Sequence, residues 1–181
     1  AFPIFIFLLV EGYFHTSTKW RYLVTLLVFG VISEVPFDMC TSARFVEINW
    51  NNIMFTLALV LAMIWVIDVL KGKMASLPKA LWYFVSFLIV AVLCIVAMNA
   101  SLDYEHHAVL IGYFCYIFHE RWALGIPFCY ISMFKEPWAL LGFGLTLTYN
   151  GERGKQNKLV NYLFYPVHLL ILGIIRMNLG I

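Results

Sequence analysis

Acidic, amide and imidazole side chains interrupt several of the most apolar stretches of this chain. Glu34 and Asp38 flank Pro36, and proline removes a helical hydrogen bond, which exposes carbonyl groups beside the two carboxylates. Such a site could bind an ammonium group or take a proton from an amine, whereas a helix end with two solvated acids would show the same pattern. Because ionisable groups are costly in a bilayer, we interpret the pair as a candidate functional site.

His168 follows Pro166 within the last apolar stretch. Asn161, Tyr165 and His168 stand at positions i, i+4 and i+7, so a helix would carry them on one face. A neutral imidazole there could act as a general base or donate a hydrogen bond to an acyl carbonyl. It could equally bond a backbone carbonyl released by the proline.

Glu11 and His15 are also one helical turn apart. An acid and an imidazole at this spacing could fix each other's protonation state or orient a base. The alternative is an ordinary helix end at the membrane interface.

A polar cluster contains Asp103, Glu105, His106 and His107. Its spacing matches no zinc signature, so we predict no metal site, and a solvated loop is the simpler interpretation.

Asn150 and Gly151 begin a short loop that continues with Arg153, Lys155 and Lys158. Its positive charges and backbone N–H groups could hold the phosphates of an acyl-coenzyme A. A basic loop on the cytoplasmic side of a membrane would look alike, and the spacing of a P-loop is absent.

Membrane helices are the expected framework for these polar groups. Hydrophobic residues make up 63% of the 181 residues and charged residues 12%, far from the half and quarter typical of soluble domains. The net charge of +2 and the lack of basic runs argue against nucleic-acid binding. Without period-two alternation, the apolar stretches predict an all-α, polytopic transmembrane bundle. The eight expected segments are 1–14, 20–37, 52–70, 80–98, 108–118, 122–134, 137–149 and 159–177.

The distribution of basic residues favours eight crossings. With all eight, nine of the twelve Lys and Arg residues lie on one side, which the positive-inside rule makes cytoplasmic. The loop at Asn150 then faces the cytoplasm, while Glu34, Asp38 and Asp103 lie towards the outer side. The chain begins abruptly in an apolar segment, so we expect residues 1–181 to be a single domain that lacks upstream residues.

Four strings, in order, resemble the motifs of the TraX family of bacterial membrane proteins. They are residues 1–16 (AFPIF and VEGYFHT), 32–38 (ISEVPFD), 149–154 (YNGERG) and 165–169 (YPVHL). The named member of that family acetylates the N-terminal alanine of F-pilin during assembly of the conjugative pilus. The family is also thought to be related to the acyltransferase-3 membrane enzymes.

The resemblance implies a multi-pass acetyltransferase of the bacterial inner membrane. It would take acetyl-coenzyme A from the cytoplasm and modify an amine or hydroxyl of a pilin or another acceptor presented at the lipid membrane. His168 would serve as base or carbonyl-facing donor, and Glu34 or Asp38 would hold the acceptor. The expected substrate-binding residues are Glu11, His15, Asp103, Asn150, Gly151, Arg153 and Tyr165.

Two departures from the family pattern bear on this expectation. Family members usually begin with a further helix that carries an Asp-His pair, and they tend towards Asp-Tyr-Gly where this chain has Asp103-Tyr104-Glu105. Two alternatives therefore stay open. One is a transporter with helices interrupted at Pro36 and Pro166, and the other is a non-catalytic scaffold in pilus or secretion assembly.

Overall fold

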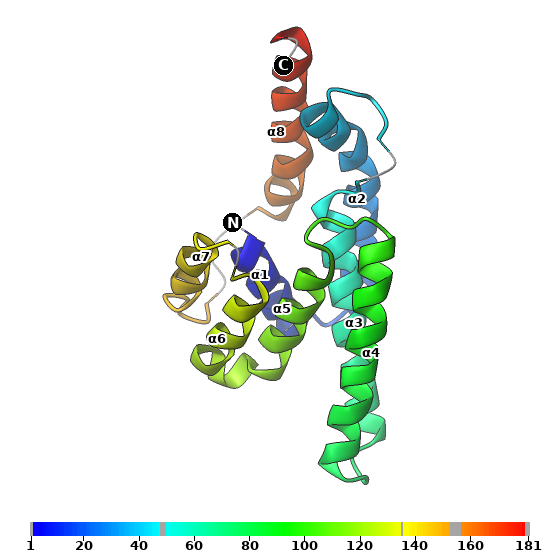
Figure 1. Ribbon diagram of the computed structural model, residues 1–181, viewed down its shortest axis with the longest axis vertical. Helices are drawn as coiled ribbons and strands as arrows, with labels where there is room; N and C mark the ends of the chain where they lie inside the picture. Colours follow the sequence, from blue (N-terminus) through cyan, green and yellow to red (C-terminus); the bar gives the residue numbers. More distant parts are fainter. Residues whose placement is uncertain (1, 48–49, 135, 153–156, 180–181) are drawn as a thin grey trace.

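The computed structural model is all-helical and describes residues 2–47, 50–134, 136–152 and 157–179 (Figure 1). The α-helices in order are α1 (Phe2–His15), α2 (Lys19–Ser42), α3 (Ile53–Lys73), α4 (Lys79–Asn99), α5 (Glu105–Ile117), α6 (Trp122–Ser132), α7 (Ala139–Thr146) and α8 (Lys158–Leu179), with a 3₁₀ turn, η1 (His119–Arg121), before α6. Each α-helix falls on one of the predicted segments. The all-α fold class is thereby confirmed.

Four of these helices, α2, α3, α4 and α8, are long and apolar enough to cross a membrane. Helix α1 is apolar but has 14 residues. Helices α5, α6 and α7 have 13, 11 and 8 residues. At about 1.5 Å per residue, the longest of these three covers about 20 Å, less than the roughly 30 Å of bilayer hydrocarbon. The chain is a membrane protein by these helices, and the number of crossings among the short helices stays a prediction.

Two prolines that were expected to interrupt helices lie inside continuous ones. Helix α2 runs past Pro36 to Ser42, and α8 runs through Pro166. The predicted end of the second segment, at residue 37, was therefore wrong by more than a turn. The two helices pack against each other along their length, and this packing supports α2 beyond the hydrogen bond that Pro36 removes.

Helix α3 lies at the centre of the bundle and contacts α1, α2, α4 and α5. Its residues Val60, Leu61, Ile64 and Ile67 are fully buried. The short helices α1, α5, α6 and α7 form a group on one side of the long α3–α4 hairpin, while α2 and α8 continue side by side beyond the start of α3 (Figure 1). Polar groups at the start of α3 are thus surrounded by α2, α8 and the loop that precedes α5.

Candidate functional site

Asn52, the N-cap residue of α3, connects that helix to Glu34 on α2. The buried amide group of Asn52 donates one hydrogen bond to the Glu34 carboxylate and another, of 2.9 Å, to the carbonyl of Gly30. The amide oxygen accepts a 2.9 Å bond from the N–H of Met54, which caps α3. The amide hydrogens of Asn52 therefore hold α3 against α2 at Glu34, while its amide oxygen caps α3.

Asp103 comes to the same place from the loop between α4 and α5. Its carbonyl accepts a 2.9 Å hydrogen bond from the hydroxyl of Thr56 on α3. Its carboxyl group accepts hydrogen bonds from the Trp50 indole and from the N–H of Tyr104, which lower the carboxyl pKa. Burial is the larger effect and raises the pKa of Asp103, and the nearby charge of Glu136 raises it further.

The backbone around Asp103 adopts an unusual conformation. Ser101, Tyr104 and Glu105 have positive φ angles of 49°, 60° and 42°, in the left-handed region that favours glycine. Each costs about 1 kcal/mol or more in a residue with a side chain, and such residues are typical of ligand and active sites. The Tyr104 ring stacks on Phe2 at 3.8 Å between ring centroids, which helps to hold the turn in place.

Tyr165 approaches this region from α8. Its hydroxyl is hydrogen-bonded to the backbone of Ile53, and it lies within electrostatic range of Asp103 and Glu34. The predicted residues Glu34, Asp103 and Tyr165 are therefore brought together from α2, the α4–α5 loop and α8. We call these three residues, with Asp38 and Asn52, the outer polar site.

Asp38 lies one turn beyond Glu34 on α2 and is buried. One carboxylate oxygen, Oδ2, accepts a 2.9 Å hydrogen bond from the N–H of Glu47, whereas Oδ1 has no hydrogen-bond partner within the described part of the chain. The hydroxyl of Ser33 is also buried without such a partner there. Buried polar atoms of this kind are costly unless a ligand or water completes their hydrogen bonds.

Helices α2 and α8 run in the same direction, and their contacts place His168 at the same level along the helix pair as Glu34. The register follows from Phe29, which stacks on Tyr162, and from Gly173, which lies against Met39.

The His168 ring is partly exposed and is held by its own helix. Its Nδ1 is 2.8 Å from the carbonyl of Phe164, and its ring packs on Phe164 and on the edge of Tyr165. The carbonyl released by Pro166 belongs to Tyr162, four residues earlier, so it is not the partner of His168.

Glu11 and His15 lie in the last turns of α1, at the end of this helix away from Phe2 and Tyr104. His119 joins them there. Glu11 Oε1 is 2.9 Å from Nε2 of His119 in η1, and Glu11 Oε2 is 3.5 Å from Nε2 of His15. The contact with His119 is an ion-pair distance without the direction of a hydrogen bond. His119 was not predicted as a site residue, because only the folded chain brings η1 to α1.

Asp68 is a second residue that the sequence analysis missed. Its two carboxylate oxygens accept hydrogen bonds of 2.8 and 2.7 Å from the hydroxyls of Tyr13 and Tyr116. The ammonium group of Lys19 lies over the Tyr13 ring and donates to the Tyr13 carbonyl. The available signal was that Asp68 is the one acidic residue of segment 52–70. We call the set Glu11, Tyr13, Lys19, Asp68, Tyr116 and His119 the inner polar centre.

The loop at Asn150 is separate from both polar groups. Asn150 Oδ1 accepts a 3.0 Å hydrogen bond from the N–H of Glu152, and Gly151 has φ +78°, so the chain makes a tight turn here. Asn150 also lines a cavity of about 440 Å³ between α1 and the end of α7. Arg153 lies outside the described residues.

Comparison with known proteins identifies a matching family and a relative. The sequence model of that family, described as TraX protein, matches residues 1–176. A relative from Dichelobacter nodosus, described as "Probable fimbrial assembly protein FimC, serogroup H1", is 28% identical over 200 residues, which cover 98% of this chain and 80% of the relative. No solved structure is significantly similar. The resemblance seen in the sequence motifs is confirmed.

Proposed function

Because this chain belongs to the TraX family, we propose that it is a membrane-embedded acetyltransferase of fimbrial or pilus assembly in the bacterial inner membrane. It moves an acetyl group from cytoplasmic acetyl-coenzyme A to an amine or hydroxyl group, such as a pilin N-terminus. The relative from Dichelobacter nodosus, which is described as a probable fimbrial assembly protein, supports the link to fimbrial assembly. The chemistry rests on the outer polar site.

The observation that carries the proposal is the convergence of Glu34, Asn52, Asp103 and Tyr165 from separate elements of the bundle. Two carboxyl groups from different elements can hold an ammonium group, and Asn52 fixes the position of one of them. An ammonium group must lose a proton before its nitrogen can attack a thioester, so a base is required nearby. His168, at the level of Glu34, is the proposed base.

The transfer itself needs no further reagent. The amine nitrogen forms a bond to the thioester carbonyl carbon while its proton passes to the base, and the carbon–sulfur bond breaks. The coenzyme A thiolate then takes up a proton. Tyr165, between His168 and the carboxylates, is the proposed donor to the oxygen that becomes negative during the attack.

We place the acetyl donor on the side of the Asn150 loop. The cavity between α1 and α7 is lined by Phe7 and Leu8 on one wall and by Thr148, Tyr149 and Asn150 at its polar end. Its volume of about 440 Å³ is within the range of small-molecule sites, and an apolar wall suits the pantetheine arm.

The test is acetyl transfer in proteoliposomes that contain the full chain. Isotope-labelled acetyl-coenzyme A is supplied with alanine-ended peptides, glycans and lipids, and products are identified by mass spectrometry. Glu34→Gln and His168→Ala should each lower the rate by at least about tenfold, a typical loss for a positioned acid–base group. Glu120→Gln, which removes an exposed carboxylate in η1, is the matched control. Wild-type rates in both site variants, or no transfer and no coenzyme A binding in the native chain, would overturn the proposal.

A further inference from the structure

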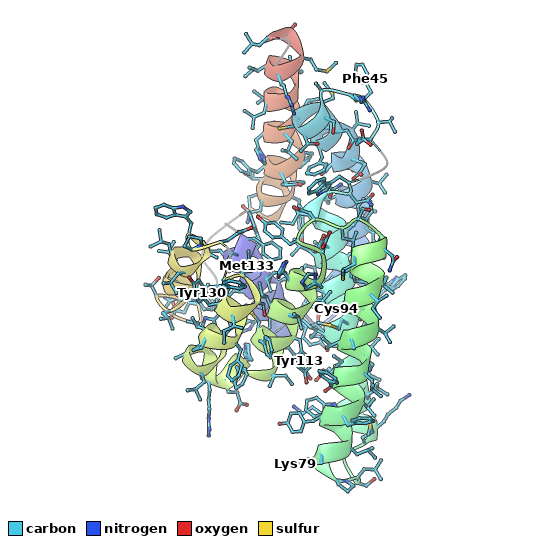
Figure 2. All side chains as sticks on the ribbon, viewed as in Figure 1. Phe45, Lys79, Cys94, Tyr113, Tyr130 and Met133 are labelled. Carbon is cyan, nitrogen blue, oxygen red and sulfur yellow. The ribbon has the colours of Figure 1, made fainter. Side chains whose placement is uncertain are left out.

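A groove of about 500 Å³ runs between α5 and α6, apart from the outer polar site and the Asn150 cavity. On α5 it is lined at successive turns by His106, Leu110 and Phe114, and on α6 by Phe128 and Ile131. The neighbouring α5 residue Tyr113 points towards α4 instead, where its hydroxyl is 2.9 Å from that of Ser86 (Figure 2). Tyr113 therefore does not line the groove.

The two ends of the groove differ in chemistry. At one end the rings of His106 and His107 lie 4.0 Å apart, and the Nδ1 atoms of both are buried without a hydrogen-bond partner among the described residues. Oε2 of the Glu105 carboxylate lies 3.7 Å from this same Nδ1 atom of His106. At the other end Phe128 packs against Phe114 and stacks on Phe118, which closes the groove with aromatic rings.

The walls of the groove face the surroundings of the protein. Ile131 and Phe134 on its rim are 68% and 67% exposed. In a chain with four helices long and apolar enough to cross a membrane, exposed apolar side chains of this kind suit contact with lipid. The groove is a depression in this apolar surface, and His106 to Phe114 extends for about 12 Å along α5.

We propose that this groove binds a phospholipid with an amine headgroup, of the phosphatidylethanolamine class. One acyl chain lies between α5 and α6, with its inner part against Phe114 and Phe128. The phosphate accepts hydrogen bonds from the two imidazoles, which both line the groove. The ammonium group pairs with Glu105. The site does not depend on acetyl transfer.

This assignment follows from the charge pattern at the polar end. Two imidazoles alone would accept any phospholipid, because every phospholipid carries a phosphate. A carboxylate beside them disfavours an anionic headgroup such as phosphatidylglycerol and favours one with a primary ammonium group.

The experiment uses the full chain in lipid nanodiscs, with photoactivatable analogues whose diazirine is in the acyl chain. Phosphatidylethanolamine, phosphatidylcholine and phosphatidylglycerol analogues are compared, and crosslinked peptides are mapped by mass spectrometry. We expect the ethanolamine analogue to label peptides of α5 and α6 above those of α4 and α8. Even labelling of all lipid-facing helices would overturn the site, and equal labelling by all three headgroups would overturn its selectivity.

Variants separate the two ends of the site. His106→Ala combined with His107→Ala should lower labelling about tenfold, as expected for the loss of two hydrogen bonds. Ser132→Trp should block the groove, while Leu88→Trp on the exposed side of α4 is the matched control. Glu105→Gln should leave labelling of α5 and α6 intact but remove the preference for ethanolamine over glycerol. Undiminished labelling in both the histidine variant and Ser132→Trp, with circular dichroism unchanged, would refute the proposal.

Discussion

At the scale of single residues, Asn52 has the most consequential position. Its amide group satisfies Glu34, Gly30 and the start of α3 at once. Asn52→Ala should remove the helix cap, which is worth about 1 kcal/mol, and the hydrogen bond to the Glu34 carboxylate, which is worth about 1.5–3 kcal/mol. We therefore expect the free energy of unfolding to fall by about 2 kcal/mol or more in mild detergent titrated with dodecyl sulfate. Asn178→Ala, which loses one exposed bond within α8, is the control. A loss below about 0.5 kcal/mol for Asn52→Ala would contradict its bridging role.

Asp103 makes stability depend on pH. Burial raises the pKa of its carboxyl group above that of an unfolded aspartate, about 3.9. The folded chain then binds this proton more tightly than the unfolded chain does. The resulting stabilisation is complete below the unfolded pKa and is lost as pH rises through the folded pKa. Unfolding midpoints measured from pH 3.5 upward (about half a unit below that unfolded pKa) should fall with pH in the native chain and less so in Asp103→Asn. If the unfolding midpoints of the two proteins changed equally with pH, the role of Asp103 would be contradicted.

The sequence predicted some of these residues and missed others for a physical reason. Glu34 and Tyr165 were predicted because polar groups in apolar stretches are conspicuous, and Asp103 was expected from the family resemblance; the structure brings the three together. Asn52 stood at the start of an apolar segment, where an amide is unremarkable. Its importance depends on the pairing of α2 with α3, which no local pattern encodes.

At the scale of helices, close contacts between α3 and α5 depend on Gly112. A Cβ atom built at Gly112 would lie 2.3 Å from Cγ1 of Val60. Gly112→Ala should therefore lower stability by about 1–3 kcal/mol through overpacking. Val60→Ala in the same chain should recover part of the loss, which a double-mutant cycle measures. Gly144→Ala, at a position with open space around it, should have little effect. Additive effects of Gly112→Ala and Val60→Ala would show that the two residues do not meet.

The place of α8 rests on its packing against α2. A Cβ atom at Gly173 would lie 2.7 Å from Cβ of Met39, and Arg176 donates a 2.7 Å hydrogen bond to the Cys40 carbonyl. Gly173→Leu should therefore displace α8 and withdraw Tyr165 from the outer polar site. Limited proteolysis should cut the chain ahead of α8 faster in this variant than in Ile174→Ala, which alters the exposed face. Equal cleavage rates would contradict the contact.

Helix positions were largely predictable from the apolar stretches and the polar breaks between them. In a bilayer, an apolar stretch must satisfy its backbone hydrogen bonds internally, which favours a helix. The continuation of α2 beyond Pro36 was not, since it depends on α8, a helix more than a hundred residues away in the chain. The Asp-Tyr-Gly departure also has a structural counterpart. Glu105 occupies a left-handed conformation in which glycine would be less strained.

At the scale of the whole molecule, one end of the bundle carries a cluster of lysines and the other carries the acidic residues of the outer polar site. Lys71, Lys73 and Lys79 lie at the turn between α3 and α4, opposite the end that carries Glu34 and Asp103. We predict that the lysine-rich turn is cytoplasmic. In a chain whose native cysteines are replaced, Ser76→Cys should react with an impermeant maleimide only from the cytoplasmic side. Phe45→Cys, in the exposed connection after α2 (Figure 2), should react only from the other side. Labelling of both positions from one side would overturn this orientation.

The hydrogen bonds of Asp68 also have a consequence for how the protein is made. One partner, Tyr13, is synthesised before Asp68, but the other, Tyr116, follows it by 48 residues. A carboxylate at this depth of an apolar helix opposes release into lipid until it is paired. Helix α3 should therefore remain beside the insertion machinery until α5 has emerged from the ribosome. Helices α1, α3 and α5 would then enter the lipid together. The order of translation would thereby become part of the folding pathway.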